Sequence, residues 1–195
     1  MEINILFVIS AYLLGSIPTG LLLAKAFCGV DIRSTGSGNI GATNVYRTIG
    51  PRIGILTLFG DCLKGALPVV IAKSLALPVY WIALIGLAAF LGHVYTVFLG
   101  FKGGKGVATA LGVFLAASPL AVLVALVVFS LVLYRWRYVS LASITASALM
   151  PSLVALIDGE PAIVLMTLVI AAVVILKHRE NIKRLKNGTE NKFKA

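Results

Sequence analysis

The chain alternates long apolar stretches with short segments rich in glycine, proline or charge. The apolar stretches cover, to within a few residues at each end, 3–25, 53–72, 79–100, 107–117, 119–134, 138–157 and 161–177. A helix takes about 20 residues to cross roughly 30 Å of hydrocarbon. The pattern therefore predicts an all-α polytopic membrane protein, a bundle of seven transmembrane helices of which two are short.

Two of these stretches differ from a simple internal span. Segment 107–117 is too short to cross the bilayer upright. We expect it either to begin deep in the membrane or to join 119–134 in one bent unit at Pro119. The apolar run that starts at Ile3 has no basic residues before it and no clear cleavage site after it, so we expect a retained first span.

Composition supports the membrane class. Of the 195 residues, 59% are hydrophobic and 12% charged, and the mean hydropathy is +1.02, whereas soluble domains carry about 25% charged residues. We therefore exclude a soluble enzyme and expect one domain over 1–195. The cysteines, Cys28 and Cys62, show no CxxC or Cys/His spacing, so we expect both to pack and no metal to be bound.

Basic residues outnumber acidic ones by 17 to 7. With seven spans, one face of the membrane carries the 177–195 tail together with Arg33, Arg47, Arg52, Lys102, Lys105, Arg135 and Arg137. Lys73 lies in an opposite loop, on the same side as the acidic DGEP segment. The excess of positive charge on cytoplasmic loops predicts an N-terminus outside and a C-terminus in the cytoplasm.

Three polar segments fall on the predicted cytoplasmic face, at 31–47, 100–106 and 177–190. The first contains GSGNIG, which has the glycine spacing of a dinucleotide-binding loop. That loop works only between a strand and a helix of a soluble unit, so the apolar surroundings exclude it. The second, GFKGGKG, is not a Walker A loop, because Gly106 rather than Ser or Thr follows Lys105.

Both glycine-rich segments suit a phosphate. Glycine lets backbone N–H groups approach an anion closely, and a helix N-terminus favours negative charge. The candidate phosphate-binding groups are Gly36, Gly38, Asn44, Arg47, Lys102, Gly103, Gly104, Lys105 and Gly106, with Ser37 and Asn39 as further hydrogen-bonding side chains. The alternatives are a tight turn with an anchoring lysine at GGKG, and a helix N-cap at Thr43 or Asn44.

The third segment places His178 and Asn181 three residues apart, on one face of a helix continuing from the last span. The alternative is a polybasic helix attracted to anionic lipid. Within the spans, Asp61 and Lys64 have a spacing that permits an ion pair, for which we favour a structural role over catalysis. His93 is expected to form a hydrogen bond between helices.

Taken together, STGSGNIGATNVYR, GFKGGKG and HRENIKRLKNGTE, in this order and spacing, resemble the PlsY family of bacterial acyl-phosphate:glycerol-3-phosphate acyltransferases, seven-span membrane enzymes. GSIPTG, FGDCLKG and GHVYTVFLG extend the resemblance over essentially the whole chain. It implies transfer of a fatty acyl group from acyl phosphate to the 1-hydroxyl of glycerol 3-phosphate, giving lysophosphatidic acid and inorganic phosphate for phospholipid biosynthesis. The location implied is the bacterial cytoplasmic (inner) membrane, with the active site on the cytoplasmic side.

The resemblance also implies residue roles. Ser37 and Arg47 match the functional residues of the first motif, the glycines around Lys105 match the glycerol-phosphate motif, and His178, Asn181 and Glu190 match the third. We predict catalytic roles for the set Ser37, Asn39, His178 and Asn181, and supporting roles for the set Asp61, Lys64, His93 and Glu190. Partners are glycerol 3-phosphate, acyl phosphate and membrane lipids, with no nucleic acid, no cofactor and the oligomeric state open.

Two other functions compete with this one. A small transporter for an organic phosphate would also place basic residues near broken helices, and a lipid-binding scaffold would use the basic tail as an anchor. The proton acceptor is open as well. His178 is a candidate base or orienting donor, and a substrate phosphate oxygen is a candidate acceptor.

Overall fold

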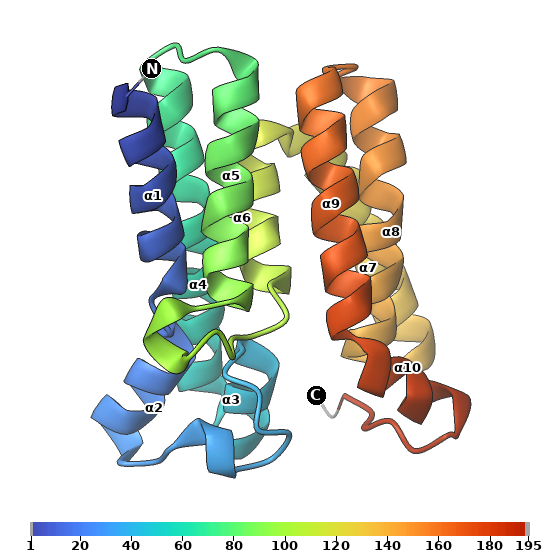
Figure 1. Ribbon diagram of the computed structural model, residues 1–195. Helices are drawn as coiled ribbons and strands as arrows, with labels where there is room; N and C mark the ends of the chain where they lie inside the picture. The colour runs from blue at the N-terminus through green and yellow to red at the C-terminus, as the bar shows by residue number, and fades with distance from the viewer. Residues whose placement is uncertain (1, 194–195) are drawn as a thin grey trace. The chain divides into compact units, whose positions relative to one another are not determined.

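The computed structural model describes residues 2–193, and the regular secondary structure in that range is helical (Figure 1). The chain divides into two compact units after Ala117. The first contains α1 (Glu2–Ser16), α2 (Thr19–Cys28), η1 (Ile32–Ser34), α3 (Ala42–Thr48), α4 (Pro51–Ser74), α5 (Val79–Val94), η2 (Val97–Leu99) and α6 (Val107–Ala117). The second contains α7 (Pro119–Trp136), α8 (Val139–Ile157), α9 (Pro161–Lys177) and α10 (Arg179–Lys186).

Each predicted apolar stretch consists of one helix or of two helices in succession, which confirms the all-helical class. Among the described residues, five segments are long and apolar enough to span a membrane, namely Glu2–Cys28, Pro51–Ser74, Val79–Leu99, Pro119–Trp136 and Val139–Ile157. The pair α9 and α10, bent by 55°, makes a sixth if it counts as one span, and α6 is a shorter apolar helix. The count of seven spans, the orientation and the single domain stay predictions.

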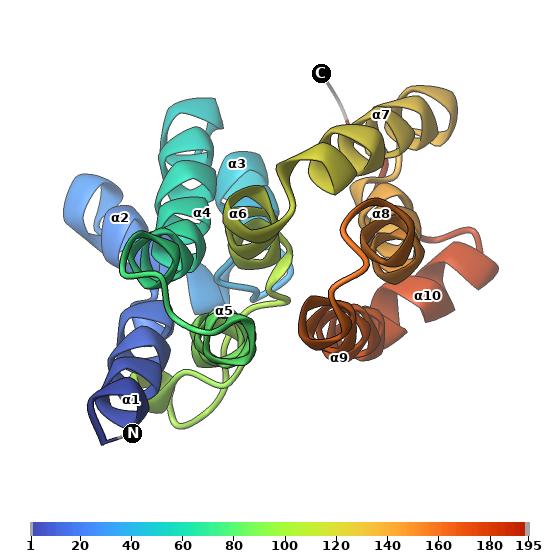
Figure 2. The same ribbon diagram turned by 90° about the horizontal axis from the view of Figure 1, so that it is seen from above.

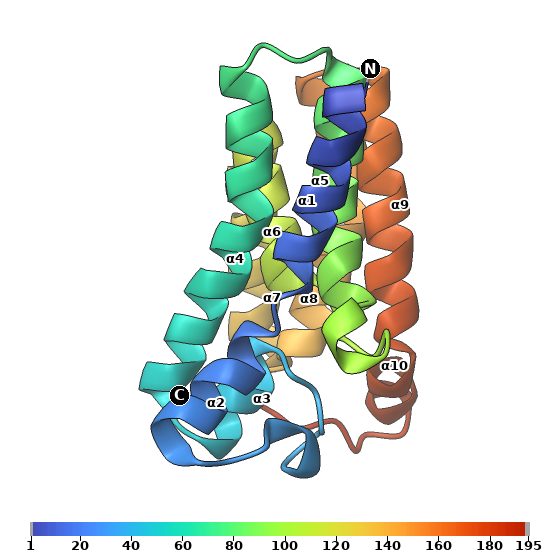
Figure 3. The same cartoon turned by 60° about the vertical axis from the view of Figure 1, so that its left-hand side comes forward.

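The first predicted span is broken rather than continuous. Helix α1 ends at Ser16 and α2 begins at Thr19, because Pro18 has no N–H to donate and its ring disfavours a continuous helix (Figure 3). A carbonyl left without a partner in hydrocarbon costs several kcal/mol. Here the Ser16 carbonyl accepts the Thr96 hydroxyl at 2.6 Å, and the Ile17 carbonyl accepts Lys64 Nζ at 2.7 Å.

Glycines bring the helices of the first unit close together (Figure 2). A Cβ added at Gly15 of α1 would lie 2.0 Å from the Ala89 carbonyl oxygen of α5. One added at Gly112 of α6 would lie 1.9 Å from the Cys62 carbonyl oxygen of α4. Small residues at such contacts let backbones approach, which is how helices gain packing energy in a membrane. The pairs α1–α5 and α4–α6 therefore pack backbone against backbone.

The second unit pairs α7 with α8 and α8 with α9, and α10 contacts the ends of α8 and α9. The Ser118 hydroxyl donates to the Asp158 carboxylate at one end of these helices. At the other end the tail returns to the turn after α7, where the Phe193 N–H donates to the Arg137 carbonyl at 2.6 Å. Of the two cysteines, Cys62 is half-buried, but Cys28 is exposed. The expectation that both pack is therefore wrong for Cys28, which is the last residue of α2 at the edge of the first unit.

Candidate functional site

The first polar segment is organised by one buried side chain, Asn44 on α3. Its Nδ2 donates to the carbonyls of Ile32, Thr35 and Asn39 at 3.3, 3.1 and 2.9 Å, and its Oδ1 accepts the Ser37 N–H at 2.9 Å. The residue is 5% exposed. These bonds satisfy the hydrogen-bonding groups of its amide within the protein. We therefore infer that Asn44 shapes the loop around Ser37, and its predicted contact with substrate stays untested.

The loop that Asn44 holds presents the other candidates of this segment. Gly36 and Gly38 have φ of 57° and 68°, a left-handed backbone that side chains disfavour, and a Cβ at Gly36 would lie 2.4 Å from Asn44 Oδ1. Ser37 is exposed, as is Arg47 on the last turn of α3. Asn39 is half-buried, and its Oδ1 accepts the Gly41 N–H at 2.8 Å. Ser37 and Arg47 thus lie at the surface of the first unit.

Sequence reasoning missed the partner of Arg33. Asp31 caps η1 and accepts Arg33 Nε at 2.9 Å and Arg33 Nη2 at 2.6 Å. The hydrogen bonds from the Arg33 side chain and backbone hold the pKa of the Asp31 carboxyl well below its usual range. The carboxylate neutralises the charge of Arg33 locally. An Asp two residues before an Arg at the start of a polar loop is the signal that would have found this pair.

The glycines of the second segment fold back on the end of α5. The N–H of Gly103 donates to the Val94 carbonyl at 3.2 Å, and the N–H of Gly104 donates to the His93 carbonyl at 3.1 Å. These carbonyls lie in the last turn of α5, where a helix leaves its carbonyls without partners. In this structure these two N–H groups are therefore bonded to α5, and the predicted binding role of Gly103 and Gly104 stays a prediction. Lys102 is exposed, Lys105 is half-buried, and the buried Gly106 leads into α6.

A buried group of ionisable side chains lies behind this segment. Lys64 Nζ is 2.7 Å from Asp61 Oδ1, which confirms the ion pair, and His93 Nδ1 is 3.5 Å from the same oxygen. All three residues are at most 6% exposed. His93 joins α5 to α4 as an interhelical contact, but among the described residues its Nδ1 has no hydrogen-bond partner, so this atom does not form the predicted hydrogen bond. Charges within membrane helices normally face the interior of a bundle, and these do.

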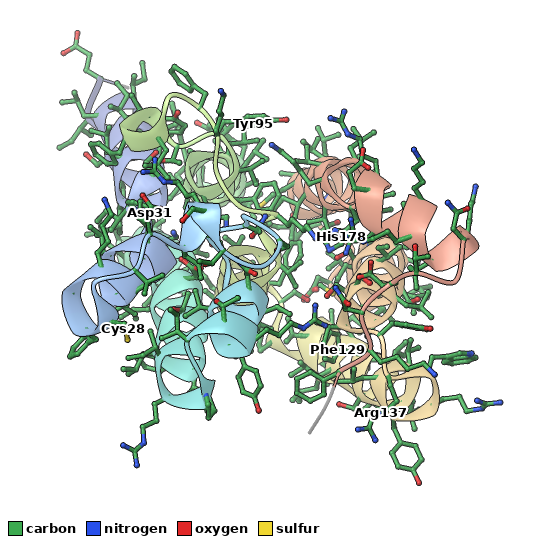
Figure 4. All side chains as sticks on the ribbon, turned by 90° about the horizontal axis from the view of Figure 1, so that it is seen from below. Cys28, Asp31, Tyr95, Phe129, Arg137 and His178 are labelled. Atoms are coloured by element: carbon green, nitrogen blue, oxygen red, sulfur yellow. The ribbon has the colours of Figure 1, made fainter. Side chains whose placement is uncertain are left out.

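The two segments of the first unit gather at one end of it (Figures 1 and 4). A small core of Leu21, Ala24, Ile32, Ile40 and Val45 holds the first segment, and Leu99 of η2 packs against that core. Gly20 brings α2 against the first segment, since a Cβ there would lie 2.1 Å from the Ile40 carbonyl oxygen. Figure 4 looks at this end and labels Asp31 and Tyr95, which belong to the two neighbouring loops.

In the second unit, His178 stands at the bend between α9 and α10 (Figure 4). The residue is 3% exposed, and its Nδ1 lies 2.8 Å from the Val174 carbonyl oxygen. A carbonyl only accepts, so Nδ1 carries the proton and, in the neutral ring, Nε2 carries the lone pair. Local geometry thus gives His178 the tautomer that a general base needs at Nε2. The predicted helix continuing from α9 is bent here by 55°.

The Glu190 carboxylate accepts hydrogen bonds from two side chains of this tail and from one of α8. Its Oε1 accepts Asn181 Nδ2 at 2.7 Å and Ser140 Oγ at 2.8 Å, and its Oε2 accepts Arg184 Nε at 2.7 Å. Burial alone raises the pKa of Glu190, but the hydrogen bonds from Asn181, Arg184 and Ser140 outweigh it and hold the pKa below its ordinary value. The geometry favours the supporting role predicted for Glu190, because it fixes Asn181 on α10. Sequence reasoning missed Ser140 and Arg184.

This arrangement predicts a loss of stability in acid. Because the folded state lowers the pKa of Glu190, its contribution is fully present above the ordinary carboxyl pKa of about 4.3 and is lost as pH falls through the folded-state value. Glu190→Gln should make the midpoint of thermal unfolding less dependent on pH between neutrality and acid. Glu180→Gln is the control, since Glu180 is exposed beside Arg179. An equal acid dependence in Glu190→Gln and the parent protein would contradict the prediction.

The structure thus places Ser37 and Asn39 in one loop held by Asn44 of α3, sets the GGKG turn on α5, and joins Asn181 to Glu190 in the second unit. Within residues 2–193, no three His, Cys, Asp or Glu side chains gather as metal ligands would. The predictions that neither a metal nor a cofactor takes part remain predictions, and so do the catalytic and binding roles.

Comparisons with known proteins agree over nearly the whole chain. A family profile described as glycerol-3-phosphate acyltransferase matches residues 5–188. The glycerol-3-phosphate acyltransferase of Geotalea daltonii is 69% identical over 194 residues, covering 100% of both chains. That of Geobacter sulfurreducens is 66% identical over 185 residues, covering 95% of both.

Two solved structures are similar in fold and sequence. Both are of PlsY, an integral membrane glycerol 3-phosphate acyltransferase, and both are 48% identical to this chain. The glycerol 3-phosphate form gives a TM-score of 0.94, covering 98% of this chain and 96% of that one. The lysophosphatidic acid form gives a TM-score of 0.90, covering 98% and 95%.

Proposed function

The chain belongs to the PlsY family of glycerol-3-phosphate acyltransferases, and on that premise we propose that it takes its acyl group from acyl phosphate and delivers it to the sn-1 hydroxyl. The products are lysophosphatidic acid and inorganic phosphate, for phospholipid biosynthesis. The enzyme works in the bacterial inner membrane, with its active site on the cytoplasmic side. The observation that carries the proposal is the similarity over nearly the full chain to PlsY structures in glycerol 3-phosphate and lysophosphatidic acid forms.

The fold suits reactants that have a charged head and, in one of them, a long apolar chain. The first unit is built of apolar helices, with two polar segments at one end. Arg47 and Lys105 supply positive charge in these segments, and an Arg guanidinium can bind two phosphate oxygens at once. The proposed role of Ser37, Arg47, Lys102 and Lys105 is to hold phosphate. Holding two reactants in register contributes up to about 7–11 kcal/mol to catalysis.

The proposed reaction is a direct acyl transfer. The glycerol hydroxyl oxygen attacks the carbonyl carbon of acyl phosphate, the bond from that carbon to the phosphate oxygen breaks, and phosphate leaves with the bonding electrons. The hydroxyl proton passes to His178 Nε2, whose lone pair follows from the bond between Nδ1 and the Val174 carbonyl. Asn181, fixed by Glu190, is the proposed donor to the oxygen on which negative charge develops. No covalent acyl-serine is required.

Phosphate release tests the donor and the acceptor together. Detergent-purified protein given palmitoyl phosphate and glycerol 3-phosphate should release inorganic phosphate and form 1-palmitoyl lysophosphatidic acid, and both should depend on the acceptor. Palmitoyl coenzyme A and palmitoyl acyl carrier protein, supplied in place of palmitoyl phosphate, should give no product. Turnover with either thioester but not with palmitoyl phosphate would overturn the donor, and a 2-acyl product would overturn the sn-1 assignment.

A further inference from the structure

Burying the ionisable group Asp61, Lys64 and His93 within the apolar helices costs free energy. Ions within a membrane cost free energy, and a buried ion pair is often no more stabilising than apolar side chains of similar volume. Lys64 has a clear use, because its Nζ binds both Asp61 and the Ile17 carbonyl at the break in the first span. His93 is 4% exposed. Among the contacts of the described residues, it makes none with the break between α1 and α2. Its position indicates another role.

The imidazole of His93 lies directly against the GGKG turn. A Cβ built on Gly104 would lie 2.2 Å from His93 Nε2, so only glycine fits at 104 while the ring is in place. The backbone of His93 holds the same residue, since its carbonyl accepts the Gly104 N–H at 3.1 Å. His93 therefore contacts Gly104 through both its ring and its main chain. Gly104 is the residue immediately before Lys105.

The other nitrogen of the ring faces the Asp61 carboxylate without forming a hydrogen bond. His93 Nδ1 lies 3.5 Å from Asp61 Oδ1, and Asp61 is held by Lys64 at 2.7 Å. A continuous set of contacts thus runs from α4 through His93 to the residue before Lys105. An apolar side chain at 93 would fill space against Gly104 but would offer no polar atom to the Asp61 carboxylate.

We propose that His93 is a positioning residue for glycerol 3-phosphate, which acts through Gly104 to fix Lys105 against the phosphate of that substrate. The Asp61 carboxylate lies beside the imidazole on the side away from Gly104. The inference rests on the proposed function, in which Lys105 holds phosphate, and it assigns that phosphate to the acceptor. His93 itself contacts neither substrate in this assignment.

A double-mutant cycle in acceptor affinity tests the contact. The variants are His93→Ala, Gly104→Ala and the combination, and the measured quantity is the Kd for glycerol 3-phosphate without donor. Each single change should raise this Kd by about tenfold, and the combination should raise it little beyond His93→Ala, because removal of the ring makes room for the new methyl group. His93→Gln, which keeps a polar chain of similar reach, provides a second cycle if His93→Ala does not fold.

Gly15→Ala is the matched control. It also places a methyl group against α5, 2.0 Å from the Ala89 carbonyl oxygen, but it does not touch segment 100–106. It should lower the thermal midpoint and leave the Kd unchanged. Additive effects at 93 and 104, or an equal rise of Kd in Gly15→Ala, would show a general packing role and overturn the proposal. Because binding is measured without donor, failure of palmitoyl phosphate as a substrate leaves this cycle interpretable, whereas failure of the parent protein to bind glycerol 3-phosphate removes the acceptor assignment.

Discussion

Replacing His178 by Asn is expected to lower kcat by about 10²–10⁴-fold while the protein stays folded. The Asn amide nitrogen takes nearly the place of Nδ1, so it can still donate to the Val174 carbonyl at the bend between α9 and α10. The change removes Nε2, which carries the lone pair of the neutral ring. A loss in kcat at saturating substrates, with an unchanged thermal midpoint, would show that Nε2 takes part in the reaction as the proton acceptor or as the acceptor of an orienting hydrogen bond.

The matched variant for this prediction is His178→Gln, whose amide reaches toward the position of Nε2 but is a very weak base. It should be as inactive as His178→Asn if proton transfer is the role. If His178 only orients the hydroxyl by accepting its hydrogen bond, His178→Gln should recover most of kcat through its amide oxygen. Full activity in His178→Asn would assign the proton to the leaving phosphate oxygen and contradict the mechanism proposed above.

The helical fold could be predicted from local signals. Spans of apolar residues bounded by Gly, Pro and charge mark the helices, because the hydrocarbon requires both apolar side chains and internally paired backbones. The ion pair of Asp61 and Lys64 could also be predicted, since residues three apart in a helix are neighbours. Each of these inferences depends on residues close in the sequence.

The features that escaped prediction depend on contacts between distant residues. Pro18 marks a break, but the side-chain donors to the two carbonyls before it, Thr96 for Ser16 and Lys64 for Ile17, come from residues far away in the sequence. The GGKG segment has the composition of a phosphate loop, yet the N–H groups of Gly103 and Gly104 donate to carbonyls at the end of α5. The local sequence pattern does not distinguish a glycine whose backbone lies against a ligand from a glycine whose backbone lies against a helix.

Replacing Lys64 by Met is expected to lower the free energy of unfolding by about 3–5 kcal/mol, because it leaves the Asp61 carboxylate buried without its main counter-charge. It also removes one of the donors to the Ile17 carbonyl at the break between α1 and α2, which keeps the Thr19 N–H at 3.0 Å. Combining Lys64→Met with Asp61→Asn should recover the part due to the uncompensated charge. The measurement is the free energy of unfolding in mixed detergent micelles.

Lys73 is the control within the same helix, because its Nζ also donates to a backbone carbonyl, that of Ala116 at 2.9 Å, but the side chain is exposed. Lys73→Met should cost less than about 1 kcal/mol, since an exposed lysine keeps most of its hydration in either state. Similar costs for Lys64→Met and Lys73→Met would show that burial of the charge is not what matters at 64. A large cost at 64 that Asp61→Asn does not reduce would instead assign the whole effect to the bond with Ile17, and the first span would then depend on Lys64 as a cap for its broken helix rather than as a counter-ion.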